Sequence, residues 1–325
     1  MLVTDGGRPV TGLTRSHFDL RDNGVEQVVT DVSAETLPLN VICVLDLSGS
    51  VAGSPLAQLK DGLTALIDAL AAADRAALVS FSERLQLHTP LTGDTMLLRR
   101  LVDGVKAGGS TSVIDAAFAG LALREADAGR TMMLLFSDGR DTASWLPART
   151  VLDSARRTDV VVYPVTVRLT NSLNMITYVK PRSSESVTWA SRPPPVDDDG
   201  LRLLDAFADE TGGRMFYAEG QGALRKTFLD VLAEFRQRYV LSYTPTRVPA
   251  DGWHTIEVKL RGRSGQIKAR RGYFAAPSRP PQQPKHHRDE DERHGRQHEA
   301  GRRHHVAQRT ALTLGRSRDL QTLSE

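Results

Sequence analysis

The sequence predicts an α/β fold in which a doubly wound, mostly parallel sheet is inserted into a β-sandwich built from both ends of the chain. Two observations support this prediction. Apolar, strand-like runs alternate with amphipathic helices from about residue 39 to residue 238. On either side of that region, short segments alternate apolar and polar residues with period two and are separated by turns, as is typical of strands with one exposed face.

The central region begins with a buried strand. Residues 40–46, NVICVLD, form a continuous apolar run of the kind found in strands covered on both faces. Residues 54–72 place leucines at helical spacing and predict an amphipathic helix. Residues 85–91, LQLHTPL, are interpreted as an edge strand, and further buried strands are predicted over 131–137 and 159–167. Helices are expected between these strands, which is the pattern of a parallel sheet.

The domain boundaries are expected where this pattern changes. We expect residues 1–38 and 239–276 to be the two halves of the sandwich and residues 39–238 to be the α/β domain. A segment at about 168–200, rich in Ser, Pro and charged residues, predicts a surface insertion, interpreted either as a plain loop or as one that gates a ligand. Residues 277–325 contain few apolar residues and predict a disordered tail.

The composition argues against several classes of protein. The chain has 42 Lys or Arg and 39 Asp or Glu, and the tail from Pro277 contains 10 and 7 of these, so the body is neutral and we expect no nucleic-acid partner. No apolar run reaches the roughly 18 residues of a membrane span. The single cysteine, Cys43, excludes an internal disulfide and is interpreted as a small buried side chain.

The first residues, MLVTDGGRPV, lack the basic and apolar regions of a signal peptide. From these residues alone, the chain is expected either to be cytoplasmic or to have its true beginning further upstream.

Three loops of the predicted α/β domain carry hydroxyl and carboxylate side chains. The first, DLSGS, contains Asp46, Ser48 and Ser50 and follows the first buried strand. The second, GGSTS, contains Thr111, and the third, SDG, contains Asp138. In open α/β sheets ligands bind beyond the carboxyl ends of the strands. We therefore expect these five residues to form one site.

This set of oxygen ligands, without Cys or His, suits a hard divalent cation. Mg²⁺ is the first candidate, with Mn²⁺ or Ca²⁺ as alternatives. A cation held mainly by neutral hydroxyls and two carboxylates stays electron-poor and can accept an acidic oxygen from a partner. Trp145 follows the third loop and is interpreted either as part of the binding face or as a packing residue.

Each loop taken alone has a purely structural alternative. Ser50 or Ser54 is a candidate cap for the helix that follows the first loop. Thr111 or Ser110 is a candidate cap for the next helix, with Asp115 as an acid in its first turn. SDG is an ordinary turn sequence.

The order Asp-x-Ser-x-Ser, then Thr, then Asp, each in its strand context, resembles the metal-ion-dependent adhesion site (MIDAS) of von Willebrand factor type A (VWA) domains. The resemblance covers about residues 39–238 and implies a Rossmann-like fold. It implies that the hydroxyls of Ser48, Ser50 and Thr111 bind the ion directly. Asp46 and Asp138 would bind it directly or through water.

The flanking sequences, with GRPV near the beginning and RQRYVLSYTP after the domain, resemble the bacterial VWFA-related family first described from acidobacteria. Members of that family usually carry an export signal. The resemblance therefore implies a periplasmic or extracellular protein whose beginning is truncated in this chain.

The sequence thus predicts a protein-binding module of the adhesion type, not an enzyme, that captures an Asp or Glu side chain of a protein partner through a divalent cation. One alternative is a structural or assembly subunit whose cation only stabilises the loops. Another is a serine hydrolase with Ser48 or Ser50 as nucleophile. For that reaction the body offers only His17, His88 and His254, and no Gly-x-Ser-x-Gly elbow. No oligomeric state is predicted.

Overall fold

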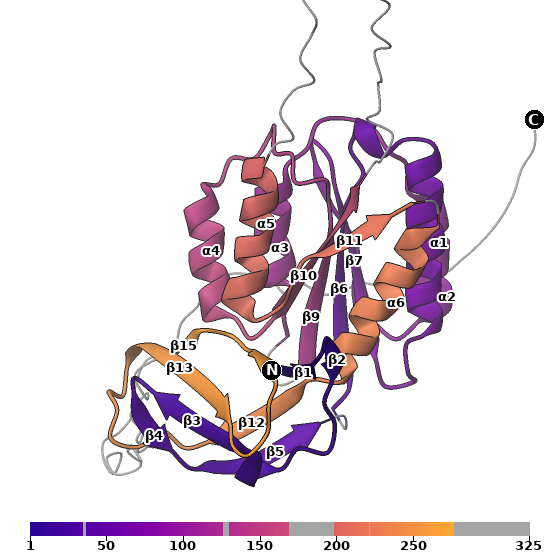
Figure 1. Cartoon of the computed structure of the whole chain (residues 1–325). Helices are drawn as coiled ribbons and strands as arrows, with labels where there is room; N and C mark the ends of the chain where they lie inside the picture. Colours follow the sequence, from indigo (N-terminus) through magenta and orange to yellow (C-terminus); the bar gives the residue numbers. More distant parts are fainter. Residues whose placement is uncertain (35–36, 126–129, 169–197, 221, 276–325) are drawn as a thin grey trace, which may run out of the picture. The chain divides into compact units, whose positions relative to one another are not determined.

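The computed structural model describes residues 1–34, 37–125, 130–168, 198–220 and 222–275. Its central element is a six-stranded sheet with the order β11-β10-β9-β6-β7-β8 (Figure 1). All neighbouring strands are parallel except the edge strand β8, which is antiparallel to β7. The strands are β6 (Leu39–Asp46), β7 (Arg75–Phe81), β8 (Leu85–Thr92), β9 (Arg130–Phe136), β10 (Val161–Arg168) and β11 (Phe216–Glu219).

Helices cover both faces of this sheet. In Figure 1, α1, α2 and α6 lie on one face and α3, α4 and α5 on the other. Their bounds are α1 (Ser54–Asp68), α2 (Thr95–Gly104), α3 (Val113–Ala122), α4 (Ala148–Arg157), α5 (Asp198–Thr211) and α6 (Ala223–Arg236). The predicted α/β class, a doubly wound and mostly parallel sheet, is therefore confirmed.

The central strand β6 shows why its sequence is apolar throughout. Val41, Cys43 and Leu45 pack in one core cluster with α1, α2 and α6. Ile42 and Val44 pack in a second cluster with α3, α4 and α5. Fully burying one side chain of this size contributes about 1.5–3 kcal/mol. Burial also raises the pKa of the Cys43 thiol to about 12, so this thiol stays protonated, as expected of a packing residue.

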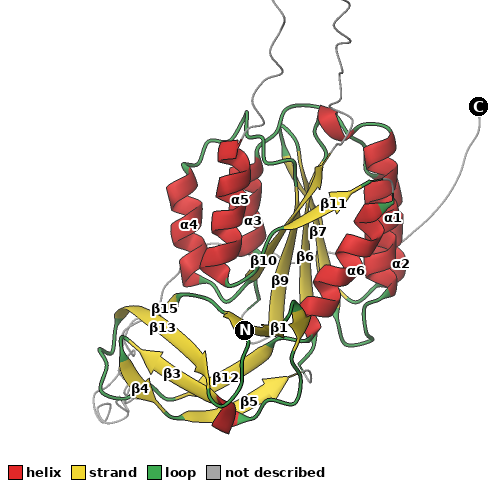
Figure 2. Cartoon of the chain, viewed as in Figure 1, coloured by secondary structure: helices red, strands yellow, loops and turns green. Residues whose placement is uncertain are grey.

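Strands from both ends of the chain form what we call the terminal β-module, β1–β5 together with β12–β15 (Figure 2). Three antiparallel pairings join the two ends, β1 with β14, β3 with β13 and β5 with β12. The strands are β1 (Leu2–Asp5), β2 (Arg8–Pro9), β3 (Phe18–Asp22), β4 (Val25–Gln27), β5 (Val29–Ala34), β12 (Tyr239–Tyr243), β13 (Gly252–Leu260), β14 (Gln266–Lys268) and β15 (Gly272–Ala275). The division into domains at residues 38 and 239 stays a prediction.

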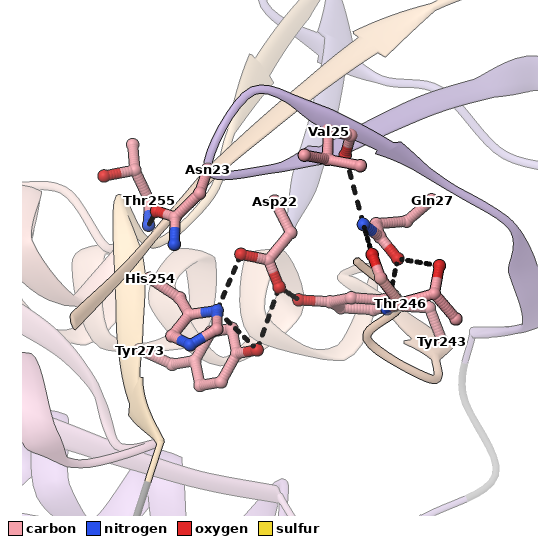
Figure 3. Close-up of polar contacts among 9 residues, drawn as sticks. All are labelled: Asp22, Asn23, Val25, Gln27, Tyr243, Thr246, His254, Thr255 and Tyr273. Carbon is pink, nitrogen blue, oxygen red and sulfur yellow. Dashed lines mark hydrogen bonds and ion pairs between the residues drawn. The ribbon is translucent and has the colours of Figure 1, made fainter. Parts of the chain in front are cut away.

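A buried polar cluster lies inside the terminal β-module (Figure 3). The carboxylate of Asp22 is completely buried. Its Oδ1 lies 2.8 Å from Nδ1 of His254, and its Oδ2 accepts hydrogen bonds from the hydroxyls of Tyr243 at 2.8 Å and Tyr273 at 2.9 Å. Burial, together with the bonds to Asp22, raises the pKa of both tyrosines. The cluster therefore ties β3 to β12, β13 and β15.

Most of the predicted insertion at 168–200 and the predicted tail at 277–325 lie outside the described residues. The helix α5 begins at Asp198, within the end of that predicted insertion. None of the helices in the described part of the chain has the length and apolar character needed to cross a membrane.

Candidate metal centre

The first of the three loops begins at the carboxyl end of β6, where Asp46 is the last residue of the strand and is completely buried. Both of its carboxylate oxygens have a donor. The backbone N–H of Ser48 donates to Oδ1 at 2.9 Å, and the hydroxyl of Ser137 donates to Oδ2 at 3.0 Å. These two bonds fix the orientation of the carboxylate at the edge of the sheet.

The electrostatic surroundings of Asp46 are unfavourable for its negative charge. Burial raises the pKa of this carboxyl, and the nearby charge of Asp138 raises it as well. The hydrogen bonds from Ser48 and Ser137 offset part of this effect. The two carboxylates, from the first and third loops, follow neighbouring parallel strands, since Leu45 of β6 pairs with Phe136 of β9.

Ser48 and Ser50 place their hydroxyl oxygens 3.1 Å apart. Ser48 is buried and precedes the short 3-10 helix Gly49–Val51, while Ser50 is exposed. Neither hydroxyl caps a helix. The N-cap of α1 is Gly53, which makes no side-chain hydrogen bond, so the proposal that Ser50 or Ser54 caps this helix is wrong. Gly53 has a φ of +79°, and the entry to α1 depends on this conformation rather than on a serine cap.

The second loop approaches the first through its backbone. The N–H of Gly49 donates to the carbonyl oxygen of Gly109 at 3.0 Å. The N–H of Gly108 donates to the carbonyl oxygen of Leu47 at 2.7 Å. Gly109 has a φ of +89°, which favours glycine. Thr111 follows this turn and is buried.

The expected helix caps on the second loop are also wrong. The N-cap of α3 is Ser112, and its hydroxyl donates to the carbonyl oxygen of Ser82 rather than capping the helix. The first turn of α3 is capped instead by the third loop. Asp141 Oδ1 accepts from the N–H of Val113 at 3.1 Å, and the hydroxyl of Ser144 accepts from the next two backbone N–H groups at 3.1 and 3.2 Å. Local sequence could not show caps supplied from about 30 residues away.

The third loop follows β9. Asp138 is half-buried, and its Oδ1 accepts from the N–H of Arg140 at 3.0 Å. Further along this loop, the carboxylate of Asp115 accepts hydrogen bonds from the backbone N–H groups of Trp145 at 3.0 Å and Leu146 at 2.9 Å. The indole of Trp145 is 94% exposed, so it is not a packing residue. Its backbone is held by Asp115 while its side chain faces solvent.

Ser137 is the site residue that the sequence analysis missed. Its hydroxyl donates to Asp46 and accepts from the N–H of Gly139 at 3.1 Å. The only signal in the sequence is its place directly before Asp138, at the end of a buried strand.

The three described histidines form hydrogen bonds to residues other than Ser48 and Ser50. His88 Nε2 lies 2.8 Å from the hydroxyl of Ser80, His17 bonds to Thr14, and His254 bonds to Asp22. Within the described residues, no histidine is hydrogen bonded to Ser48 or Ser50.

A family model described as von Willebrand factor type A domain matches residues 41–140. The chain contains a VWA domain. The matched region spans all three loops, from Asp46 to Asp138.

A short stretch of the chain is similar to a curated protein. Inter-alpha-trypsin inhibitor heavy chain H4 of Bos taurus is 30% identical over 123 residues, which cover 34% of this chain and 13% of that protein. This chain therefore matches only a small part of its relative.

Several solved structures are similar to the chain. A von Willebrand factor type A protein from Catenulispora acidiphila has a TM-score of 0.47 at 18% identity and covers 67% of this chain and 49% of that chain. Proximal thread matrix protein 1 from the mussel byssus, with a zinc-occupied MIDAS motif, has a TM-score of 0.48 at 14% identity, over 66% and 50% of the two chains. The vWF domain of the pili tip protein Mfa5 from Porphyromonas gingivalis has a TM-score of 0.47 at 11% identity, over 63% and 98%.

Proposed function

We propose that the VWA domain holds a divalent cation and uses it to bind an acidic side chain of a protein partner. The candidate ligands are the five residues of the three loops, Asp46, Ser48, Ser50, Thr111 and Asp138. VWA domains are in general interaction modules rather than enzymes, which supports the protein-binding function. The identity of the cation and the acidic nature of the partner are our proposals.

One observation carries this proposal. Asp46 is completely buried, ends a strand next to the one that leads to Asp138, and forms no ion pair with a basic side chain in the described chain. A buried carboxylate beside a second carboxylate is costly unless a positive charge compensates it. In the described residues no group of three or more His, Cys, Asp or Glu side chains forms a metal site, so any cation here depends on the hydroxyls. Two carboxylates with three hydroxyls fit Mg²⁺ better than a transition metal.

The proposed ligands would have different roles at the cation. Asp46 and Asp138 supply two negative charges that match one divalent cation. Ser48, Ser50 and Thr111 supply neutral oxygens, which leave the cation able to attract another carboxylate. Ser137 holds Asp46 in place and is not itself a proposed ligand. A partner carboxylate would complete the set of ligands, and the surface around the loops would select the partner.

The first test measures cation binding by titration calorimetry with MgCl₂, MnCl₂, CaCl₂ and ZnCl₂. We expect binding by the wild-type protein and a loss of affinity of more than about 10-fold in Asp46→Ala. Asp153→Ala is the matched control, because this exposed carboxylate lies on α4 and pairs with Arg156. Equal affinity in Asp46→Ala and the wild type would contradict the site.

The second test compares partner capture in Mg²⁺ and in EDTA. We expect partners that bind the wild type in Mg²⁺ and are lost in EDTA and in Asp46→Ala. If both proteins retain the same partners while only the wild type binds the cation, the cation is structural and the adhesion function is wrong. Turnover of an ester substrate that disappears in Ser48→Ala would instead support a hydrolase.

A further inference from the structure

A pocket of about 500 Å³ lies beside the candidate metal centre, between β7, β8 and the end of α2. It shares its walls with the metal-site loops. Leu47, which separates Asp46 from Ser48, lines the pocket, and its carbonyl oxygen accepts from Gly108 of the second loop. Ser82 also lines the pocket, and its carbonyl oxygen accepts from the hydroxyl of Ser112, next to Thr111. The pocket and the metal centre are therefore neighbouring parts of one surface.

Three cationic side chains line this pocket. Arg84 lies in the turn between β7 and β8, Arg100 on α2, and Lys106 in the second loop region before Gly108. All three are exposed, and no Asp or Glu is among the residues that line the pocket. The surface beside the proposed cation thus carries additional positive charge.

Neighbouring arginines form ion pairs that these three cations do not form within the described residues. Arg99, on the same helix as Arg100, pairs with Asp68 at 2.6 Å, and Arg75, on β7, pairs with Glu125 at 2.7 Å. By contrast, Arg84, Arg100 and Lys106 form no ion pair with any residue in the described part of the chain. Like charges that line one pocket repel one another, and an anion bound among them relieves this repulsion.

We propose that this pocket binds a second carboxylate of the partner, so that the protein recognises a segment with two acidic side chains. The inference rests on the proposed function, in which the first carboxylate binds the cation. An extended segment advances about 3.3 Å per residue, so the spacing between two acidic residues sets how far apart their carboxylates can bind. Two linked contacts bind more tightly than one, because the second forms at a high local concentration.

The probes are fluorescent Gly/Ser peptides that carry either one Glu or two Glu separated by one to five residues. Binding is measured by fluorescence anisotropy in Mg²⁺ and in EDTA. At one or more spacings we expect the two-Glu peptide to bind about 10-fold more tightly than the one-Glu peptide. A gain in affinity of this size is what a few exposed ion pairs supply. This gain should shrink at high salt, because exposed charges are screened.

Variants of the pocket cations test whether the tighter binding of the two-Glu peptide depends on the pocket. We expect R84E/K106E to bind both peptides with the same affinity, and R84Q/K106Q to do so if the charge reversal impairs folding. Arg15→Glu is the matched control, because it reverses an exposed charge in the terminal β-module and should keep the full gain.

The two proposals fail in different ways. If the two-Glu peptide never binds better than the one-Glu peptide, or the charge-reversed protein keeps the gain, the second carboxylate site is wrong while cation-dependent binding stands. If Asp46→Ala or EDTA leaves binding of the one-Glu peptide unchanged, the proposed function itself is wrong. Absence of binding by any peptide in Mg²⁺ would overturn both.

Discussion

The hydroxyl of Ser137 donates a hydrogen bond to Asp46 Oδ2 over 3.0 Å, joining the end of β9 to the end of β6. The same hydroxyl accepts from the N–H of Gly139, so its position is fixed by the third loop. The orientation of the buried Asp46 carboxylate thus depends on a residue of another strand.

Ser137→Ala should therefore weaken cation binding without removing a ligand. Loss of a side chain that orients a ligand typically costs about 10- to 100-fold in metal affinity. We expect a loss at the lower end of that range by calorimetry, because the N–H of Ser48 still holds the other oxygen. Ser154→Ala, which removes only a bond to a carbonyl within α4, should keep the wild-type affinity. Unchanged affinity in Ser137→Ala would show that this bond is not needed.

Cation binding should also slow amide hydrogen exchange in α6. The helix α1 begins just after the first loop and packs closely on α6, since a Cβ on Gly62 would lie 3.1 Å from the ring of Phe228. Ordering of the loop by Mg²⁺ should stabilise this helix pair. We expect exchange within Ala223–Arg236 to slow at least about 3-fold in Mg²⁺ for the wild type and not for Asp46→Ala. Identical exchange with and without Mg²⁺ would show that α6 does not respond to the site.

Replacing Asp22 should destabilise the protein strongly. Asp22→Asn keeps the size of the side chain but removes the negative charge of the carboxylate. Two tyrosine hydroxyls and His254 form hydrogen bonds to that carboxylate. Leaving buried polar groups poorly paired costs about 2–4 kcal/mol. We expect a loss of this size in the free energy of unfolding measured with urea. Asp5→Asn, at an exposed position, should change it by less than about 0.5 kcal/mol.

His88 should titrate below the ordinary pKa of a histidine, because burial lowers its pKa. The folded protein then resists protonation that the unfolded chain accepts, so this residue makes the protein less stable as the pH falls below about 6.5. NMR titration of the His88 ring, assigned with His88→Gln, should give a midpoint below 6.5 in the folded protein. A midpoint at or above that value would contradict the shift. The effect on stability should be small, since the ring is half-buried and solvent screens its charge.

Much of the fold followed from local patterns. The continuous apolar run before Asp46 predicted a strand covered on both faces, and β6 packs against helices on both sides. The alternation of strands and helices predicted the parallel sheet, since parallel strands need crossover connections. The first and third loops meet because they follow β6 and β9, whose carboxyl ends share one edge of the sheet. The second loop lies between α2 and α3 and is joined to the first by backbone hydrogen bonds of Gly49 and Gly108. Whether their five residues bind a cation together stays a prediction.

The sequence by itself determined the class of the central sheet, because hydrophobic periodicity is a local property. It also determined the order of Asp46, Thr111 and Asp138 in three successive loops of that domain. The tertiary structure alone decided which side chains hold the loops. The hydroxyl of Ser137 joins the backbone N–H of Ser48 in holding Asp46. Asp141 and Ser144 cap α3, and Asp22 meets His254 across 232 residues of sequence. Such contacts depend on how distant strands and loops are brought together, and no short-range pattern encodes them.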